Sequence, residues 1–192
     1  MKRILCTILI LFSCASLFFA EENQGDEYDD GYVYEQNGAG DQFLKITING
    51  LFPLNFEKQL KTGGSIELGY YRFLNKFLAL GGELELSYNV SIGEKLLVMI
   101  PFTLGVLYQP TYNKFEFPIY LTAGIGYETF QSIDYFPSFV MKLNPGAFYR
   151  LNEICSFGVT TTLLWVPQWY EDSSHNQNGF FLSAGIGARY HF

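Results

Sequence analysis

The hydrophobic residues of this chain recur at every second position along most of its length. Residues 180–192 show the pattern most completely, because one alternate set is wholly apolar and the other is small or polar after its first member. A period of two indicates a β-strand with two unlike faces. The stretch is longer than the usual strand of ~5–6 residues and close to the length that a tilted strand needs to cross a bilayer.

The same alternation predicts eight strands, joined by short turns after the second, fourth and sixth and by longer loops after the first, fifth and seventh. We expect the strands at 42–52, 65–73, 78–90, 95–108, 115–128, 139–150, 155–166 and 180–192. Outer-membrane barrels have an even strand number, short periplasmic turns and longer outer loops. The longer loops, 53–64, 130–138 and 167–179, are therefore predicted to face outward from the cell.

Alternation alone also fits a secreted, water-soluble barrel with its apolar face inside. The more polar face, however, is built mainly from Gly, Ala, Ser, Thr and Asn, which suit a narrow, filled lumen better than a surface in water. The apolar face ends in aromatic residues of the kind found at membrane interfaces, such as Tyr88, Tyr108, Tyr127 and Trp165. The predicted fold class is therefore all-β, an eight-stranded antiparallel up-and-down transmembrane β-barrel.

Two segments precede the predicted barrel. Residues 1–20 begin with two basic residues and continue without charge, which indicates a secretory signal peptide. An uncleaved anchor is the alternative, cleavage after Ala15 or Ala20 fits the pattern, and Cys14 resembles a lipidation site. Residues 21–41 are acidic, without Lys or Arg, and are expected to be flexible. The barrel domain is 42–192.

Charged residues on the predicted inward face are the main candidates for chemistry. They are Lys45, Glu67, Glu83, Glu85, Glu116, Glu128, Lys142, Arg150 and Arg189. Charges that face a narrow interior must be paired or hydrated. We favour a salt-bridge plug that joins the carboxylates to Lys142 and Arg189. A selective pore or an ion site formed by the neighbouring Glu83 and Glu85 is the alternative.

Other chemistry is not expected. His175 lies in a polar loop with Asp172 and Ser173, and residues adjacent in a loop do not easily adopt the geometry of a catalytic triad. The net charge of −7 gives no support for nucleic-acid binding, which needs a basic patch. We therefore predict a protein that is not an enzyme and that has no metal or cofactor. Trp169 and Tyr170 fit either the outer membrane interface or a binding surface.

The eight alternating strands, the signal peptide and the ending Ala188-Arg189-Tyr190-His191-Phe192 resemble the small outer-membrane barrels of the OmpA/OmpX/OmpW-like group. The resemblance implies export by the Sec pathway and residence in the lipid of a bacterial outer membrane. Tyr190 and Phe192 are similar to the terminal aromatic-x-Phe signal of that group, which the barrel assembly machinery recognises.

Two functions follow as hypotheses. The first is a structural or surface-interaction role, in which a plugged barrel presents its outer loops, as a surface antigen does, to host or environmental ligands. The alternative is a narrow, porin-like passive channel for small apolar solutes, as in the OmpW-like members. The partly apolar inward face of the fourth strand motivates the alternative, through Leu97, Met99, Pro101 and Leu107.

Overall fold

The computed structural model describes residues 37–55, 60–131, 133–169 and 177–192. The predicted signal peptide, with Cys14, Ala15 and Ala20, lies outside the described residues, as do most of the acidic segment and the loop residues Tyr170, Asp172, Ser173 and His175. Among the described residues, no helix is long and apolar enough to cross a membrane.

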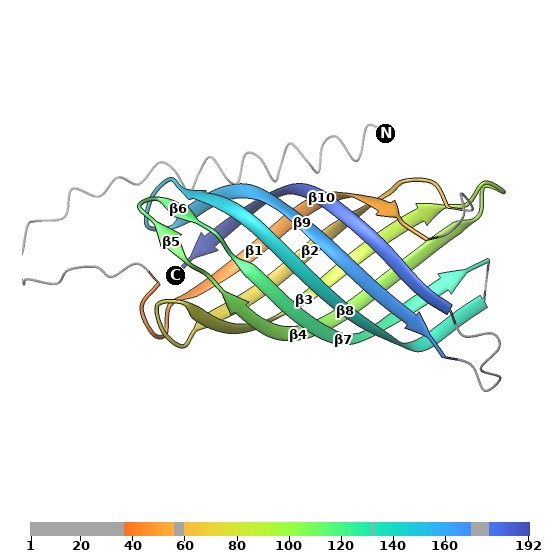
Figure 1. The fold of residues 1–192 in the computed structure, drawn as a ribbon, viewed down its shortest axis with the longest axis horizontal. Helices are drawn as coiled ribbons and strands as arrows, with labels where there is room; N and C mark the ends of the chain where they lie inside the picture. The colour runs from red at the N-terminus through yellow and green to blue at the C-terminus, as the bar shows by residue number, and fades with distance from the viewer. Residues whose placement is uncertain (1–36, 56–59, 132, 170–176) are drawn as a thin grey trace, which may run out of the picture. The chain divides into compact units, whose positions relative to one another are not determined.

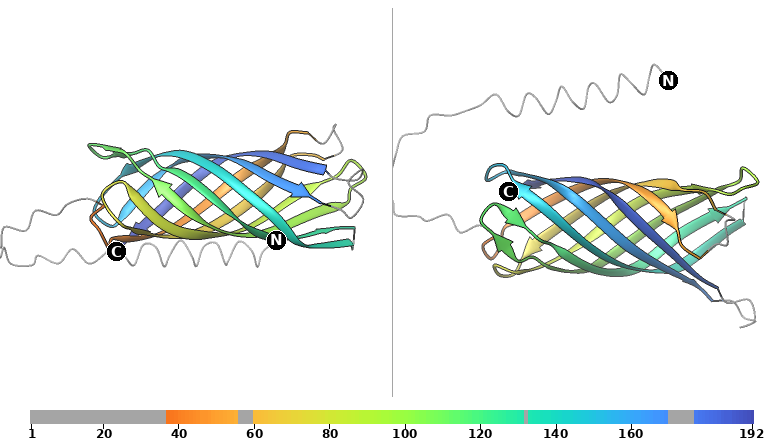
Figure 2. Two further views of the ribbon diagram at one scale, coloured as in Figure 1. Left: turned by 60° about the horizontal axis from the view of Figure 1, so that its bottom comes forward. Right: turned by 45° about the horizontal axis from the view of Figure 1, so that its top comes forward.

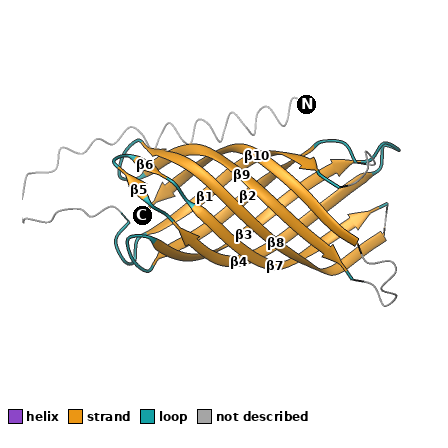
Figure 3. Cartoon of the chain, viewed as in Figure 1, coloured by secondary structure: helices purple, strands orange, loops and turns teal. Residues whose placement is uncertain are grey.

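The described residues form one closed antiparallel sheet, drawn in Figures 1 and 3. Its strands are β1 (Gln42–Pro53), β2 (Gly63–Phe73), β3 (Leu78–Val90), β4 (Leu96–Tyr108), β5 (Thr111–Tyr112), β6 (Phe115–Glu116), β7 (Ile119–Phe130), β8 (Ile133–Arg150), β9 (Cys155–Gln168) and β10 (Gln177–His191). The eight long strands are each paired with two neighbours, and the pairings β1–β10 and β8–β9 close the sheet. The predicted fold class, an eight-stranded antiparallel barrel, is confirmed.

The predicted fifth strand, 115–128, is interrupted in the structure. Its first residues form β6, which pairs with β5 in a small hairpin, and β7 begins only at Ile119. Pro118 lies in the gap and has no N–H to give to the sheet. Asn113, with a φ of 53°, turns the chain between β5 and β6. The hairpin therefore replaces a simple turn before β7.

The predicted loop 130–138 is wrong. β7 runs to Phe130 and β8 starts at Ile133, so the two strands are joined by a tight turn in which Gln131 has a φ of 55°. Asp134 and Pro137 are residues typical of a loop, but β8 pairs here with β7, while its pairing with β9 starts only at Met141 opposite Trp165. Pro137 lies where the β7–β8 register shifts, between the pairs Gly126–Ser138 and Glu128–Tyr135. A proline is tolerated at such an irregularity, because its missing N–H is not needed by the sheet.

The two ends of the barrel differ. The terminal end holds the start of β1, Phe192, the β5–β6 hairpin and the turns after β2 and β8, whereas the loop end holds the connections after β1, β3, β7 and β9. Figure 2 shows the tilt of the strands between these ends. The tight wall requires small residues: a Cβ on Gly124 would lie 2.0 Å from the carbonyl oxygen of Phe102.

The alternation along each strand separates an outer apolar face from an inner, mostly polar one. On β3, Leu84 is 50% exposed, while its neighbours Glu83 and Glu85 are 1% and 4% exposed. The same holds on the other long strands, where Ile48, Phe102 and Ile186 project outward. A surface that presents Leu, Ile, Val and Phe all around is unfavourable in water and suits contact with lipid chains. The protein is thus built as a membrane barrel.

Candidate functional site

The inner face of the barrel is the candidate site, because it holds the charged residues singled out in the sequence. All nine side chains are buried, each 6% exposed or less: Lys45, Glu67, Glu83, Glu85, Glu116, Glu128, Lys142, Arg150 and Arg189. Eight of them form two linked clusters, one in the middle of the lumen and one toward the terminal end. The ninth, Glu128, lies alone at the loop end.

The central cluster joins β1, β2, β3 and β8 across the lumen. The Nζ atom of Lys45 lies 2.6 Å from Glu67 Oε1 and 2.5 Å from Glu83 Oε1. Lys142 Nζ lies 2.5 Å from Glu67 Oε2, 2.7 Å from Glu83 Oε2 and 3.4 Å from Glu85 Oε2. Each lysine thus pairs with more than one carboxylate, and Glu67 and Glu83 each bridge both lysines.

The terminal cluster lies closer to the terminal end of the barrel and is centred on Glu116. Arg150 Nη1 donates to Glu116 Oε1 at 3.0 Å, and Arg189 Nη1 donates to Glu116 Oε2 at 3.1 Å. Arg189 also donates to Gln109 Oε1 at 2.8 Å and to the hydroxyl of Tyr120 at 2.6 Å. Its guanidinium lies 3.6 Å from the centroid of the Phe148 ring, a cation–π geometry.

Tyr120 connects the two clusters. Its hydroxyl accepts a hydrogen bond from Arg189, while Lys45 Nζ lies 4.0 Å from the centroid of its ring. Together the clusters bring four cationic side chains against four carboxylates, so their formal charges cancel. Buried charges are costly unless paired and hydrogen-bonded. Every charged group here has an ion-pair partner, although the Nε atoms of Arg150 and Arg189 make no hydrogen bond within the described residues.

An apolar and aromatic cluster fills the lumen at the terminal end. It comprises Phe43, Tyr71, Phe73, Ala79, Leu107 and Tyr120, all 1% exposed or less. The rings of Phe43 and Tyr71 stack at 5.4 Å between centroids, and the Tyr71 hydroxyl donates to Glu83 Oε1 at 2.8 Å. The terminal half of the lumen is therefore occupied by side chains that contact one another across it.

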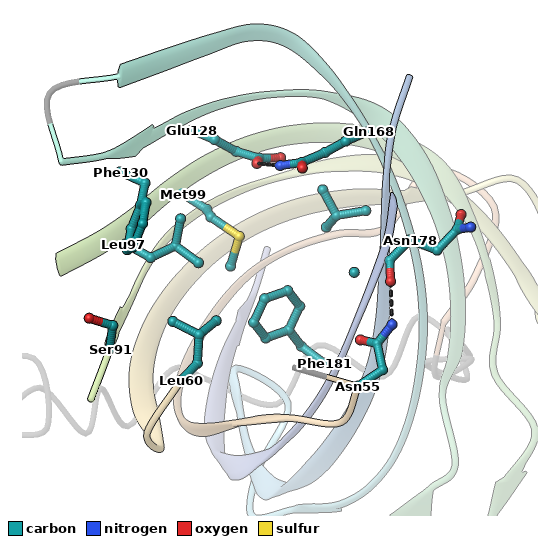
Figure 4. Close-up of a pocket in the computed structure, with 12 residues that line it drawn as sticks. Asn55, Leu60, Ser91, Leu97, Met99, Glu128, Phe130, Gln168, Asn178 and Phe181 are labelled. Atoms are coloured by element: carbon teal, nitrogen blue, oxygen red, sulfur yellow. Dashed lines mark hydrogen bonds between the residues drawn. The ribbon is translucent and has the colours of Figure 1, made fainter. Parts of the chain in front are cut away.

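The loop end of the lumen is different, because it contains a pocket of about 250 Å³, which we call the vestibule (Figure 4). Its lining residues are Asn55, Leu60, Ser91, Leu97, Met99, Glu128, Phe130, Val166, Gln168, Asn178, Gly179 and Phe181. Several of these lining residues belong to a buried apolar cluster that includes Leu51, Met99, Val166 and Phe181. The vestibule combines an apolar wall with a few polar groups, as small-molecule sites do.

Glu128 lies in the vestibule, apart from the other carboxylates. Its oxygens accept hydrogen bonds from the hydroxyl of Ser138 and, at 2.9 Å, from Nε2 of Gln168. The apolar inward residues of β4 are also divided between the two ends. Leu97 and Met99 line the vestibule, whereas Leu107 belongs to the terminal aromatic cluster. The fourth strand therefore does not present one continuous apolar path.

The aromatic residues predicted for the membrane interfaces lie on the outer face near both ends. Tyr88 and Tyr127, 52% and 36% exposed, are near the loop end, and Tyr108, 48% exposed, is near the terminal end. Trp165 is half-buried near the loop end and donates from Nε1 to Asn178 Oδ1 at 3.1 Å. Tyr190 and Phe192 are outward-facing at the terminal end, with ring centroids 5.9 Å apart.

Sequence reasoning missed several polar partners of the charged groups. Tyr71 and Tyr120 fall in the inward phase of their strands, and this phase could have identified them. Gln109 and Gln168 fall in a predicted turn and a predicted loop, and no local pattern marks them as partners of Arg189 and Glu128. Only the closed barrel brings these residues to the same height in the lumen.

Comparisons with known proteins agree with the fold. The chain is 9% identical to Neisserial surface protein A, with a TM-score of 0.62 over 80% of this chain and 99% of that one. It is 15% identical to the outer membrane protein OprG of Pseudomonas aeruginosa (TM-score 0.51, 82% and 99% covered). It is also 15% identical to Ail, the attachment invasion locus protein of Yersinia pestis, solved in complex with the heparin analogue sucrose octasulfate (TM-score 0.54, 80% and 99% covered).

Sequence comparison adds two findings. An uncharacterized protein of Treponema pallidum (strain Nichols) is 23% identical over 178 residues, which cover 83% of this chain and 81% of that protein. One protein-family model matches residues 23–190, most of the chain. The chain therefore belongs to the family that this model represents, and it has the fold of the small eight-stranded outer-membrane β-barrel proteins.

Proposed function

We propose that this protein is a bacterial outer-membrane barrel whose lumen is closed to ions and which acts at the cell surface through its loop end. The observation that carries the proposal is the pairing of Lys142 on β8 with Glu67 and Glu83 on β2 and β3. These strands face each other across the lumen, so the ion pairs block the path that an ion would take.

Three features support a role at the surface. The outward apolar face favours lipid around the barrel. Outer-membrane barrels place their longer loops outside the cell, which assigns the loop end, with its longer β1–β2 and β9–β10 connections, to the exterior. Ail, which shares the fold, was solved with a heparin analogue bound. We infer that the loop end of this chain likewise contacts host or environmental ligands.

Ion conductance tests the proposal. The mature chain, refolded and checked for heat-modifiable migration on a gel, is inserted into a planar bilayer. We expect no discrete openings from the wild type. The double variant Lys142→Ala/Glu83→Ala keeps the net charge, removes two side chains from the lumen and is expected to show openings. The matched control is the double variant Lys114→Ala/Glu153→Ala at two exposed positions, which should show no openings. Discrete openings of the wild-type barrel would contradict a closed lumen.

Passage of small apolar solutes is the second candidate function. Two observations favour it: the apolar wall of the vestibule, and the β8–β9 pairing that, in the described residues, begins only at Met141 opposite Trp165. An apolar solute could leave the vestibule sideways where the two strands are not paired. Uptake of a hydrophobic fluorophore into liposomes that contain the barrel would measure this. A Leu97→Trp substitution should reduce uptake, because the indole fills the vestibule.

We also infer that the chain reaches the membrane by Sec export and is inserted by the barrel assembly machinery. The exposed pair Tyr190 and Phe192 at the terminal end fits a signal read by that machinery. On this proposal a Phe192→Ser chain is exported normally but less of it reaches the heat-modifiable, folded form in cells.

A further inference from the structure

The vestibule contains a carboxylate that has no cationic partner among the described residues. Glu128 is 5% exposed, and within the described residues no Lys, Arg or His nitrogen pairs with it, although every other lumen carboxylate has such a pair. Lys95, at the same end of the barrel, donates to Gln131 instead. Glu128 is thus the one lumen carboxylate of the described chain whose charge is not balanced by a neighbouring side chain.

The hydrogen bonds of Glu128 show how its carboxylate is held. The Ser138 hydroxyl donates to Oε1 and the Gln168 amide donates to Oε2, so both oxygens act as acceptors. A carboxylate offers about four acceptor positions, and these two bonds leave room for a further donor. Figure 4 shows Glu128 and Gln168 side by side on one rim of the vestibule, with Met99 next to Glu128 and with Leu60 and Phe181 across the space.

The other residues that line the vestibule are apolar or uncharged. Met99, Phe181 and Val166 are 3% exposed or less and form the wall with Leu97. Among the polar lining groups, Asn55 donates to the carbonyl of Asn178 and accepts from the N–H of Phe180. A ligand therefore meets one anionic acceptor, an apolar wall and a few neutral polar groups.

These properties select a class of ligand. A divalent metal ion needs several oxygen ligands, and no group of three or more His, Cys, Asp or Glu residues in the described chain is placed to hold a metal. An anion would be repelled by Glu128. We propose that the vestibule binds a small organic monocation, a primary ammonium group on an apolar body, with the ammonium donating to Glu128 and the body lying against Met99 and Phe181.

The pocket size is consistent with such a ligand, because about 250 Å³ far exceeds the ~10–15 Å³ of cavity volume that one water needs. An ammonium group on an aryl or short alkyl body would place its charge on the rim and its hydrocarbon on the wall. The inference goes beyond a closed surface barrel, since it assigns a ligand class, and it does not depend on whether the lumen conducts ions.

A binding experiment with three matched probes tests it. The refolded chain in lipid nanodiscs is titrated with 2-phenylethylammonium, neutral 2-phenylethanol and anionic 3-phenylpropionate, with isothermal calorimetry as the readout. We expect the cation to bind at least about tenfold more tightly than the alcohol, since hydrogen bonds to charged groups are the stronger kind, and the anion to bind most weakly. The same titrations are repeated with empty nanodiscs, whose signal is subtracted as partitioning into lipid.

Three variants separate the contributions. Glu128→Gln keeps the shape of the side chain and should remove the preference for the cation while leaving the binding of the alcohol unchanged. Leu97→Trp fills the vestibule and should weaken the binding of the cation and of the alcohol. Glu153→Gln, in the exposed turn at the opposite end, should leave the binding of all three probes unchanged. The inference is overturned if folded wild type binds no probe beyond the empty nanodisc signal, if it binds the three probes equally, or if Glu128→Gln retains the preference for the cation.

Discussion

Replacing Lys142 by Met tests the role of the central cluster most directly. The methionine side chain keeps most of the length and volume of lysine but has no charge. Lys142 pairs with Glu67, Glu83 and Glu85 at 2.5, 2.7 and 3.4 Å. After the substitution Glu67 and Glu83 share Lys45, while Glu85 loses the ion pair that the structure gives it.

The expected cost follows from the burial of these groups. Glu67, Glu83 and Glu85 are 2%, 1% and 4% exposed, so the unpaired carboxylates cannot turn toward bulk water. Removing one partner of a buried ion pair typically destabilises a protein by about 3–5 kcal/mol. We expect a loss in that range for Lys142→Met. The double variant Lys142→Met/Glu85→Gln should recover part of it, because it removes the carboxylate left without a cation.

Unfolding by urea in detergent micelles, followed through tryptophan fluorescence, measures these differences. Lys114→Met, in the exposed β5–β6 hairpin, is the matched control and should stay within about 0.5 kcal/mol of the wild type, as surface substitutions usually do. A Lys142→Met barrel as stable as the control would refute the reasoning. So would a double variant that is no more stable than Lys142→Met, because Glu85 would then not carry the unbalanced charge.

Two further predictions concern the terminal cluster and the wall. Arg189→Met should destabilise the barrel by about 3–5 kcal/mol in the same urea assay, whereas Arg72→Met, on an exposed position of β2, should have little effect; equal midpoints would contradict this. Gly124→Ala should lower the refolded yield on a heat-modifiability gel, because the added methyl meets a carbonyl at 2.0 Å. Gly93→Ala, where the nearest atom is at 3.8 Å, should refold normally.

The alternation along the chain was sufficient to predict the barrel class, because a period of two assigns a face to every residue without knowledge of the partner strands. It failed where a strand lacks one of its neighbours. Residues 133–138 contain Asp134 and Pro137, which indicate a loop, yet they continue β8, because this part of the strand is paired on one side only. Polar and proline signals do not distinguish such an edge from a turn.

The pairings inside the lumen could not be derived from the sequence. The phase of the strands puts Lys142 and Glu67 on the same face of the sheet, but they are 75 residues apart and meet only because the wall is closed and tilted. For the same reason, the separation of Glu128 from the other carboxylates was not foreseen. The height of each residue along the barrel axis depends on the register of every intervening strand pair, which no local pattern encodes.

The long-range character of the ion pairs also affects how the barrel forms. Lys142 and Glu67 are 75 residues apart, and Arg189 and Glu116 are 73 apart, so these contacts form only after most of the wall is in place. A partly closed sheet would hold unpaired charges in a membrane interior, where they are strongly unfavourable. Intermediates should therefore be poorly populated, so that the wall closes in one cooperative step and opens slowly once the last ion pair is made.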